Sequence, residues 1–444
     1  MTKRKYRLNY GHEEVDVDAP LGREPKFLTP SSPAVANDTS HIIKCALDNP
    51  IDSPPLTDVV SGAKRVAIVA SDSTRATSSH LFLPHIIEEL NAAGIPDRNI
   101  TIVIALGIHR PQTKEEHRGL LGDQLYRRFA PIDHDSRNRD NLVSYGKTSR
   151  GTEVAVNRTV AEADRIVLTG AVSPHYFAGF GGGRKSIMPG VCSLEASLQS
   201  HLLVFNPPPG RGRNPNARVA RLAGNPVHED MLEAAGMVGP HFMLNSIVTP
   251  EKELAAVFAG NFIKAHEAAC FHYIKNFSIV VPEQADLTVV SCGGYPKDIN
   301  FIQAHKAIHS AHSVTKPGGW MIVLAECADG FGHPGFIDWF RFDDAIEFEQ
   351  ELRANYHIYG QTAYAAFEKA MSVNIALISR LDPLDVQRMK MRPAASFEEA
   401  YRAATANLPN DFTTYIIPAA SSTLFLPENE RSRSLASIGR SVGE

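Results

Sequence analysis

The sequence predicts an α/β fold of two domains, each with a mainly parallel, helix-flanked sheet of the doubly wound type. Short apolar runs rich in β-branched residues recur along the chain, which is typical of strands buried on both faces of a parallel sheet. Amphipathic stretches of helix length separate several of these runs, and polar turns containing glycine follow several of them. With 444 residues, the chain is long enough for about two or three packed units.

The strands are expected where the apolar runs occur, at 64–71, 99–107, 164–172, 286–294, 319–327 and 374–379. Helices are expected at 80–94, 226–238, 262–276 and 396–408. In the last helix, Ser396 and Glu399 have capping-box spacing. A new strand-rich segment starts after Pro282, so a boundary is predicted near 272–285, giving an N-terminal domain of 1–275 and a C-terminal domain of 276–444.

Composition favours a small-molecule partner. Apolar residues make up 43% of the chain and charged residues 21%, with a formal net charge of -4, which argues against disorder and against nucleic-acid binding. The five cysteines are scattered and lack a C-x-x-C pair, which fits a reducing compartment. The first twenty residues lack the apolar core of a signal peptide, and no apolar run reaches the roughly 18 residues of a membrane span. We therefore expect a cytoplasmic protein without membrane contact.

A glycine-rich stretch, "HYFAGFGGGRKSIMPG" at 175–190, resembles a nucleotide-binding loop at first sight. The Walker pattern started at Gly179 requires glycine where the chain has Arg184, and the G-x-G-x-x-G fingerprint fails as well. Backbone N–H groups of the glycine run, beside Arg184 and Lys185, would still suit a phosphate or carboxylate. A flexible surface loop with two solvated bases is the alternative.

Further polar side chains lie on turns that follow the predicted strands. In open α/β sheets such turns converge on one site at the carboxyl ends of the strands. Histidine supplies metal ligands and acid/base groups, and an arginine can clamp a carboxylate or phosphate. A single histidine is more often structural, and an aspartate in a turn is often only a cap. The candidates on these turns are Asp72, Arg75, His109, His175 and His201.

A predicted helix that includes residues 303 to 312 carries two sets of polar residues on opposite faces. His305, His309 and His312 have a spacing that could hold zinc, whereas Gln303 and Lys306 lie on the opposite face. Only one face can meet a ligand cleft. We favour Gln303 and Lys306 as ligands of an acidic substrate and interpret the histidine face as surface or packing.

Together these residues closely resemble those of the nickel-pincer lactate racemase family. The resemblance lies in the segments "SDSTRATSS", "ALGIHRPQT", "SPHYFAGFGGGRKSIMPG" with the following "SH", "LAGNPVHEDMLEAA" and "GGYPKDINFIQAHKAI". It implies a two-domain α/β protein with the active site in the interdomain cleft. It also implies a nickel-pincer nucleotide, a pyridinium mononucleotide whose two sulfur-bearing arms hold nickel, supplied by dedicated maturation proteins.

The resemblance implies a role for each matching residue. Lys185 would carry the covalently attached cofactor, and His201 would be the protein ligand of nickel. His109 and His175 would be the paired acid/base groups. Arg75, Gln303 and Lys306 would bind the substrate. Cofactor binding would further involve Asp72, Gly181, Gly182, Gly183 and Arg184.

The implied reaction is racemisation or epimerisation of a 2-hydroxy acid, lactate or a related acid, by reversible hydride transfer to the cofactor. Ile302 stands where the lactate enzymes carry a tyrosine, and "YGQTAYAAFEKA" offers no clear match to their closing aromatic residue. These differences keep open a larger hydroxy acid or a sugar acid as substrate. Two different classes of protein also stay open: a non-catalytic protein that binds an anion or the cofactor, and a nucleotide-dependent enzyme.

Overall fold

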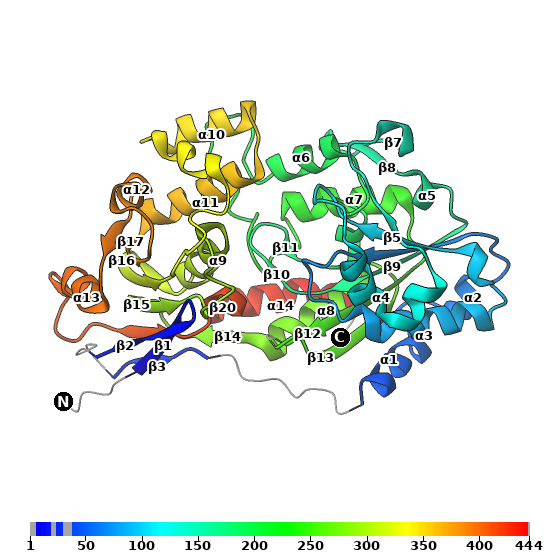
Figure 1. Cartoon of the computed structure of the whole chain (residues 1–444), viewed down its shortest axis with the longest axis horizontal. Helices are drawn as coiled ribbons and strands as arrows, with labels where there is room; N and C mark the ends of the chain where they lie inside the picture. The colour runs from blue at the N-terminus through cyan, green and yellow to red at the C-terminus, as the bar shows by residue number, and fades with distance from the viewer. Residues whose placement is uncertain (1–5, 19–23, 30–37, 250, 443–444) are drawn as a thin grey trace. The chain divides into compact units, whose positions relative to one another are not determined.

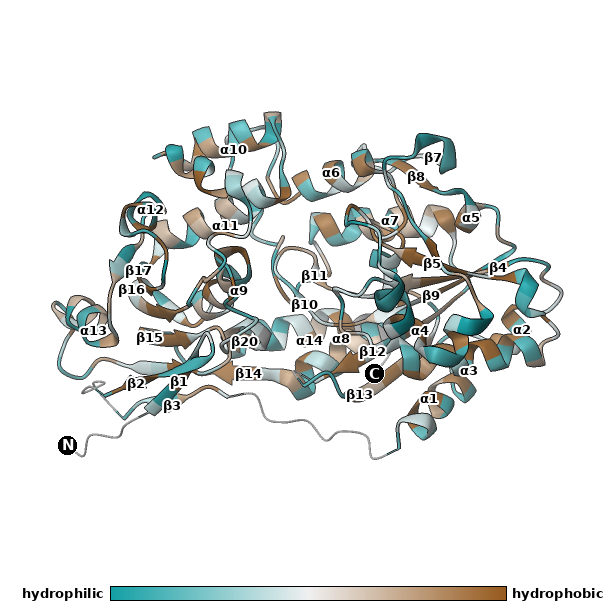
Figure 2. Cartoon of the chain, in the orientation of Figure 1, coloured by the Kyte–Doolittle hydropathy of each residue, from teal (hydrophilic) through white to brown (hydrophobic). Residues whose placement is uncertain are grey.

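Two six-stranded sheets organise the chain in a computed structural model, which describes residues 6–18, 24–29, 38–249 and 251–442 (Figure 1). Each sheet belongs to one of two units. Unit 1 takes the described parts of Met1–Ser31 together with Asn206–Gly212 and Phe277–Ser432, and unit 2 takes the rest. Strands in the middle of the two sheets, such as β5, β9 and β15, are mainly brown in Figure 2, as expected for strands covered on both faces. The α/β class and the mainly parallel sheets predicted from the sequence are confirmed.

The sheet of unit 2 has the order β13-β12-β9-β4-β5-β6. All neighbours run parallel except β12 and β13. The chain starts in the middle at β4, moves outward to β5 and β6, and then returns to β9 on the other side. This order is doubly wound, with its switch point between β4 and β9. The strands are β4 (Val66–Ser71), β5 (Ile100–Ala105), β6 (Ile132–Asp133), β9 (Arg165–Ala171), β12 (Phe242–Val248) and β13 (Leu254–Gly260).

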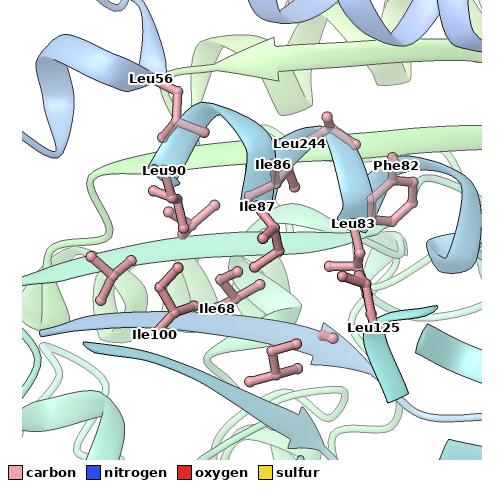
Figure 3. Packing of buried hydrophobic residues seen from close by; sticks show 14 of the residues in the cluster. Leu56, Ile68, Phe82, Leu83, Ile86, Ile87, Leu90, Ile100, Leu125 and Leu244 are labelled. Carbon is pink, nitrogen blue, oxygen red and sulfur yellow. The ribbon is translucent and has the colours of Figure 1, made fainter. Parts of the chain in front are cut away.

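Four helices of unit 2, α1 to α4, pack one hydrophobic core against this sheet. Figure 3 shows Ile86, Ile87 and Leu90 of α3 pointing toward Ile68 and Ile100 of the strands. The helices are α1 (Thr39–Asp48), α2 (Leu56–Val59), α3 (Ser79–Ala92), α4 (Lys114–Arg128), α5 (Arg158–Ala161), α6 (Leu194–Leu202), α7 (Pro226–Val238) and α8 (Lys264–Phe277). Smaller elements are the strand pairs β7 (Leu142–Lys147) with β8 (Glu153–Asn157) and β10 (Pro174–His175) with β11 (Gly179–Phe180), and the 3-10 turns η1 (Asp97–Asn99), η2 (Arg139–Asn141) and η3 (Gly183–Ser186).

The sheet of unit 1 has the order β18-β17-β16-β15-β19-β3, with every neighbouring pair parallel. It is also doubly wound, because the chain moves from β15 outward through β16 to β18 and then back to β19. The strands are β3 (Lys26–Phe27), β15 (Ala285–Ser291), β16 (Thr315–Leu324), β17 (Asn374–Ile378), β18 (Arg392–Ala394) and β19 (Thr414–Ile417). Two further pairs are β1 (Tyr6–Tyr10) with β2 (Glu13–Val17) and β14 (Ser278–Val281) with β20 (Leu424–Pro427).

The helices of unit 1 include α13, for which the sequence predicts a capping box. Ser396 Oγ accepts the Glu399 N–H at 3.2 Å, but the Glu399 carboxylate accepts the N–H of Ala395 rather than that of Ser396, so the box is only half formed. The helices are α9 (Phe301–His312), α10 (Ala345–Ala354), α11 (Ile358–Ser372), α12 (Pro383–Arg388) and α13 (Phe397–Thr405), with 3-10 turns η4 (Pro334–Arg341) and η5 (Ala420–Ser422). The chain ends in α14 (Glu428–Val442).

The first strands of the chain differ from the predicted division into 1–275 and 276–444. β3 pairs with β19 at the edge of the sheet of unit 1, and Leu8 and Val17 of the β1–β2 hairpin are buried in the core of that unit. These strands are short and largely polar, so the sequence pattern does not reveal which core they join. Among the described residues, no helix is both long and apolar enough to cross a membrane.

Candidate functional site

Three loops of unit 2 carry most of the polar residues predicted from the sequence. They follow β4, β5 and β9, which lie side by side in the sheet (Figure 1). The loop after β4 contains Asp72 and Arg75, the loop after β5 contains His109, and the loop after β9 contains His175 and Lys185. The site therefore lies at the switch point of the sheet, where this kind of fold binds its ligands.

Asp72 and His109 join the first two loops. The Asp72 side chain is buried, and its Oδ2 makes a short hydrogen bond with Nδ1 of His109. Asp72 Oδ1 accepts the hydroxyl of Thr74 at 2.6 Å. Burial alone would raise the pKa of Asp72, but the hydrogen bonds from His109 and Thr74 and the charge of Arg75 bring that pKa below its ordinary value. An ionised Asp72 accepts the Nδ1 proton of His109 and leaves Nε2 as the basic nitrogen.

His109 also borders a hollow of about 450 Å³ at the surface of unit 2. The loop 108–111 forms one wall and the loop 133–137 forms the other. The His109 side chain is 40% exposed, so part of its ring is open to solvent.

The glycine run packs into the protein more closely than its sequence suggests. Gly182 and Gly183 have φ of +73° and +54°, which favours glycine. A Cβ on Gly182 would lie 2.5 Å from Oδ1 of Asn245, and a Cβ on Gly183 would lie 2.7 Å from the ring of His266. The N–H of Gly183 donates to Asn245 at 2.7 Å, and the N–H of Gly181 donates to the Ser173 carbonyl at 2.8 Å.

These contacts correct the expectation that the whole run exposes its N–H groups to a ligand. Gly181 and Gly183 use theirs inside the protein, because the tight turn needs internal acceptors where it packs against β12 and α8. A role of this loop in holding a cofactor remains a prediction.

His175 and Lys185 lie together at the two ends of the glycine loop. Nε2 of His175 is 3.5 Å from Nζ of Lys185, and Nδ1 accepts the N–H of Ala178 at 3.2 Å. The ring of Phe177 contacts the His175 ring edge-on at a centroid distance of 4.5 Å. The Phe177 ring also contacts the His201 ring, with 5.2 Å between the ring centroids. Lys185 Nζ lies 5.8 Å from the centroid of the Phe177 ring. Phe177 thus brings the three predicted residues around one aromatic ring.

Burial disfavours the charged forms of this cluster, and the charges of the neighbouring Arg75 and Arg184 are positive. Burial, followed by the nearby charges of Lys185 and Arg75, lowers the pKa of His175 well below its ordinary value. Burial, followed by Arg184 and Arg75, lowers the pKa of Lys185 in the same way. The pKa of His201 is lowered to about 3, first by burial and then by Lys185. Such a cluster favours an anionic ligand, which would offset its mutual repulsion.

Two arginines of the site differ sharply in their surroundings. Arg75 is exposed, and its guanidinium makes no hydrogen bond or ion pair with any residue that the structure describes. Arg184 is fully buried, donates to the carbonyls of Ala178 and Gly182, and contacts Nε2 of His266 at 3.2 Å. Arg75 can therefore bind a ligand, whereas the Arg184 guanidinium already holds the loop backbone.

Gln303 and Lys306 lie in unit 1, on the first turns of α9. Asn300 caps this helix through the N–H of Gln303, and Lys306 Nζ donates to Oε1 of Gln303 at 2.6 Å. The two side chains thus form one polar pair. On the other face, His305 is buried with its Nδ1 2.6 Å from the Ile302 carbonyl. No metal-binding group of three or more His, Cys, Asp or Glu side chains occurs in the described part of the chain.

Several residues of the site escaped the sequence interpretation. Phe177 packs among the catalytic candidates, and Asn245 and His266 shape the glycine turn. Asn225 caps α7 with its carbonyl oxygen and donates from Nδ2 to the Phe177 carbonyl at 2.8 Å. The segment "LAGNPVHEDMLEAA" carries Asn225 in an N-cap pattern, which predicts the helix start but not the contact with the loop.

Comparisons with known proteins identify the family. A model of the lactate racemase N-terminal domain matches residues 10–212, and a model of the lactate racemase C-terminal domain matches 280–424. The lactate racemase of Thermoanaerobacterium thermosaccharolyticum is 32% identical over 93% of this chain and 96% of its own length. The chain belongs to the lactate racemase family. The lactate racemase of Lactiplantibacillus plantarum is 31% identical over 85% of this chain and 88% of its own.

Solved structures agree with membership of the lactate racemase family. The structure of the lactate racemase apoprotein from T. thermosaccharolyticum has a TM-score of 0.84 and 31% identity, covering 95% of this chain and 100% of the other. A Thermotoga maritima protein with a TM-score of 0.60 and 17% identity shares the fold, over 90% of this chain. As a member of this family, the chain is an isomerase.

Proposed function

We propose that the protein racemises lactate, or a closely related 2-hydroxy acid, by reversible hydride transfer to a nickel-pincer nucleotide attached to Lys185. Its named relatives, two lactate racemases, support the substrate. One structural observation carries the proposal. His109 with Asp72, His175 with Lys185, and the exposed guanidinium of Arg75 occur on three neighbouring loops at the switch point of one sheet.

The residues of the loop fit the proposed cofactor. Lys185 is an amine in a partly buried site crowded with positive charge, which suits attachment of an anionic mononucleotide. His201, near the same Phe177 ring, would be the one protein ligand of nickel. A metal held mainly by the cofactor needs no cluster of protein ligands. When bound, the cofactor supplies an acceptor for hydride from C2 of the substrate.

The protein's own residues would handle the hydroxyl proton. Removing hydride from a 2-hydroxy acid yields a planar keto acid only if a base takes the hydroxyl proton. His109, with its Nδ1 proton held by Asp72, offers Nε2 as this base. His175 would serve the opposite face of the substrate and complete the exchange of the two enantiomers.

The substrate carboxylate would be held by cationic and amide groups. Arg75 offers a guanidinium with no partner among the described residues, suited to a bidentate contact with a carboxylate. Gln303 and Lys306 would supply an amide and a second cation. Fixing the carboxylate would leave only the carbonyl end of the keto acid free to rotate between its faces.

The test is to coexpress the protein with cofactor maturation proteins and to measure three quantities on one sample: intact mass, nickel content and conversion of each lactate enantiomer. We expect a mass increase on Lys185, about one nickel per chain, and conversion in both directions. A panel that includes larger hydroxy acids and sugar acids would test the effect of Ile302 on substrate choice. A fully loaded protein that converts no hydroxy acid would overturn the proposed function.

A further inference from the structure

Arg184 is a fully buried cation without an anionic partner among the described residues. Its Nη2 donates to the Ala178 carbonyl at 2.6 Å, and its Nη1 donates to the Gly182 carbonyl at 3.3 Å and contacts Nε2 of His266 at 3.2 Å. Burying a guanidinium without a carboxylate is costly, and the hydrogen bonds of Arg184 to the loop carbonyls are what offset this cost. The shortest of them holds the Ala178 carbonyl, in the peptide group between Ala178 and Gly179.

The Ala178 residue connects Arg184 to His175. Its carbonyl accepts from Arg184, and its N–H donates to Nδ1 of His175 at 3.2 Å. An imidazole nitrogen that accepts a hydrogen bond carries no proton, so neutral His175 has its proton on Nε2. Phe177 packs edge-on against the same ring and limits its rotation.

This tautomer determines which group is the donor in the contact between His175 and Lys185. Nε2 of His175 lies 3.5 Å from Nζ of Lys185. Because Nε2 carries the proton, the imidazole is the donor and Lys185 must be the acceptor. Only an unprotonated amine has the lone pair to accept, since an ammonium group offers donors alone. Burial and the charges of Arg184 and Arg75, which lower the pKa of Lys185, act in the same direction.

We propose that Arg184 is a positioning residue: by holding the two consecutive peptide groups that meet at the Ala178 Cα, it fixes the His175 tautomer that keeps Lys185 a free amine, ready for acylation. This inference rests on the proposed function only where it takes the acyl donor to be one of the two sulfur-bearing arms of the cofactor, which is a thiocarboxylic acid (thioacid) before it is attached. In that step the Nζ lone pair forms a bond to the thioacid carbon and the C–O bond of the arm breaks. The oxygen leaves as water with one proton from the amine and one from the thioacid. Nothing is oxidised or reduced.

The test uses the unloaded full-length protein and two readouts. Nitrogen-15 NMR of the histidine rings reports which nitrogen of His175 is protonated. Acetylation by an N-hydroxysuccinimide ester at neutral pH, followed by site-resolved mass spectrometry, reports the reactivity of Lys185 against the exposed Lys44 of the same molecule. We expect a single His175 tautomer with the proton on Nε2, and Arg184→Gln should convert it to a mixture and slow Lys185 acetylation about tenfold relative to Lys44.

Two further variants keep the test decisive. Arg184→Lys retains a cation beside the Ala178 carbonyl and should keep most of His175 in the wild-type tautomer. It provides a second variant if Arg184→Gln is too unstable to study. Arg165→Gln is the matched control, because Arg165 also donates to backbone carbonyls in unit 2, at 2.7 and 2.8 Å, but lies at the start of β9, at the end of the strand opposite the loop. It should leave both readouts unchanged.

A His175 proton on Nδ1 in the wild-type protein would overturn the inference, as would Arg184 variants that leave the tautomer and the Lys185 reactivity unchanged. Both readouts are independent of racemisation. A loaded enzyme without activity would therefore contradict the proposed function while leaving this inference standing.

Discussion

His109 and His175 are the same residue type in opposite hydrogen-bonding situations. Asp72 accepts the proton of His109 Nδ1, whereas the Ala178 N–H occupies Nδ1 of His175. One histidine therefore offers a basic Nε2 and the other an Nε2 that carries a proton. The sequence identifies both histidines but not their tautomers. The partner of His109 is Asp72, which is distant in the chain, and the partner of His175 is the backbone N–H of Ala178.

The first prediction concerns the two histidines in the loaded enzyme. In His109→Asn the side-chain amide can still donate to Asp72, but it cannot take a proton from the substrate. Racemisation should fall about 100- to 10,000-fold in both directions, because exchange of the two enantiomers needs a proton-transfer group on each face of the substrate. The same loss is expected for His175→Asn.

Enantiomer conversion from each side, by chiral chromatography, measures this loss. The mass of the Lys185 adduct is the control, because it shows whether the variant still holds the cofactor. Normal rates in both directions for a fully loaded His109→Asn protein would exclude its acid/base role.

At the scale of elements, the glycine loop is held by two different constraints. Gly183 has φ of +54° and no room for a Cβ beside the His266 ring, whereas Gly151 has φ of +88° and open space around it. Gly151→Ala should cost about 1 to 2 kcal/mol from backbone strain alone. Gly183→Ala should cost about 1 to 3 kcal/mol more, because the added methyl overpacks the turn.

Urea unfolding of both variants measures the two costs. The Gly183→Ala protein should also lose the single His175 tautomer, since the displaced turn carries Arg184 and Lys185. Equal unfolding free energies for the two variants would show that the packing against His266 contributes nothing.

The elements that position the site were predictable where the pattern is strong. The runs 64–71, 99–107 and 164–172 became β4, β5 and β9, because continuous apolar stretches are typical of buried parallel strands. The glycine run was recognised, but its conformation was not. Whether a glycine N–H faces a ligand or an internal acceptor depends on Asn245 and His266, which come more than sixty residues later in the chain.

At the scale of the whole molecule, buried neutral histidines make stability depend on pH. Burial and then the charge of Arg184 lower the pKa of His266 to about 3. Burial lowers the pKa of His305 to about 4. In the unfolded chain histidine titrates near pH 6.5. As the pH falls below about 6.5, the unfolded state gains protons that the folded state cannot take, so stability is lost on the acid side.

The third prediction is that His266→Gln reduces this pH dependence. Between pH 7 and pH 5, one such histidine should contribute about 2 kcal/mol to the fall in the free energy of unfolding. Urea unfolding at the two pH values measures it, with the exposed His80→Gln as control. An unchanged pH dependence in His266→Gln would mean that His266 takes up its proton equally in both states.

The division of the chain shows the limit of reading domains along a sequence. The α/β class follows from local patterns, but the assignment of β1, β2 and β3 to unit 1 follows from Leu8 and Val17 packing with a core formed after residue 285. Short, polar strands carry too little hydrophobic pattern to reveal such a distant partner.

The most direct test of the proposed reaction follows the hydrogen on C2 of lactate. L-lactate deuterated at C2 is converted by the loaded enzyme in ordinary water, and the deuterium content of the D-lactate formed is measured by mass spectrometry. Hydride transfer predicts that the product keeps its deuterium, because a hydride leaves and returns without exchange with water. D-lactate that carries hydrogen from water at C2 would show proton abstraction instead and would contradict the proposed chemistry.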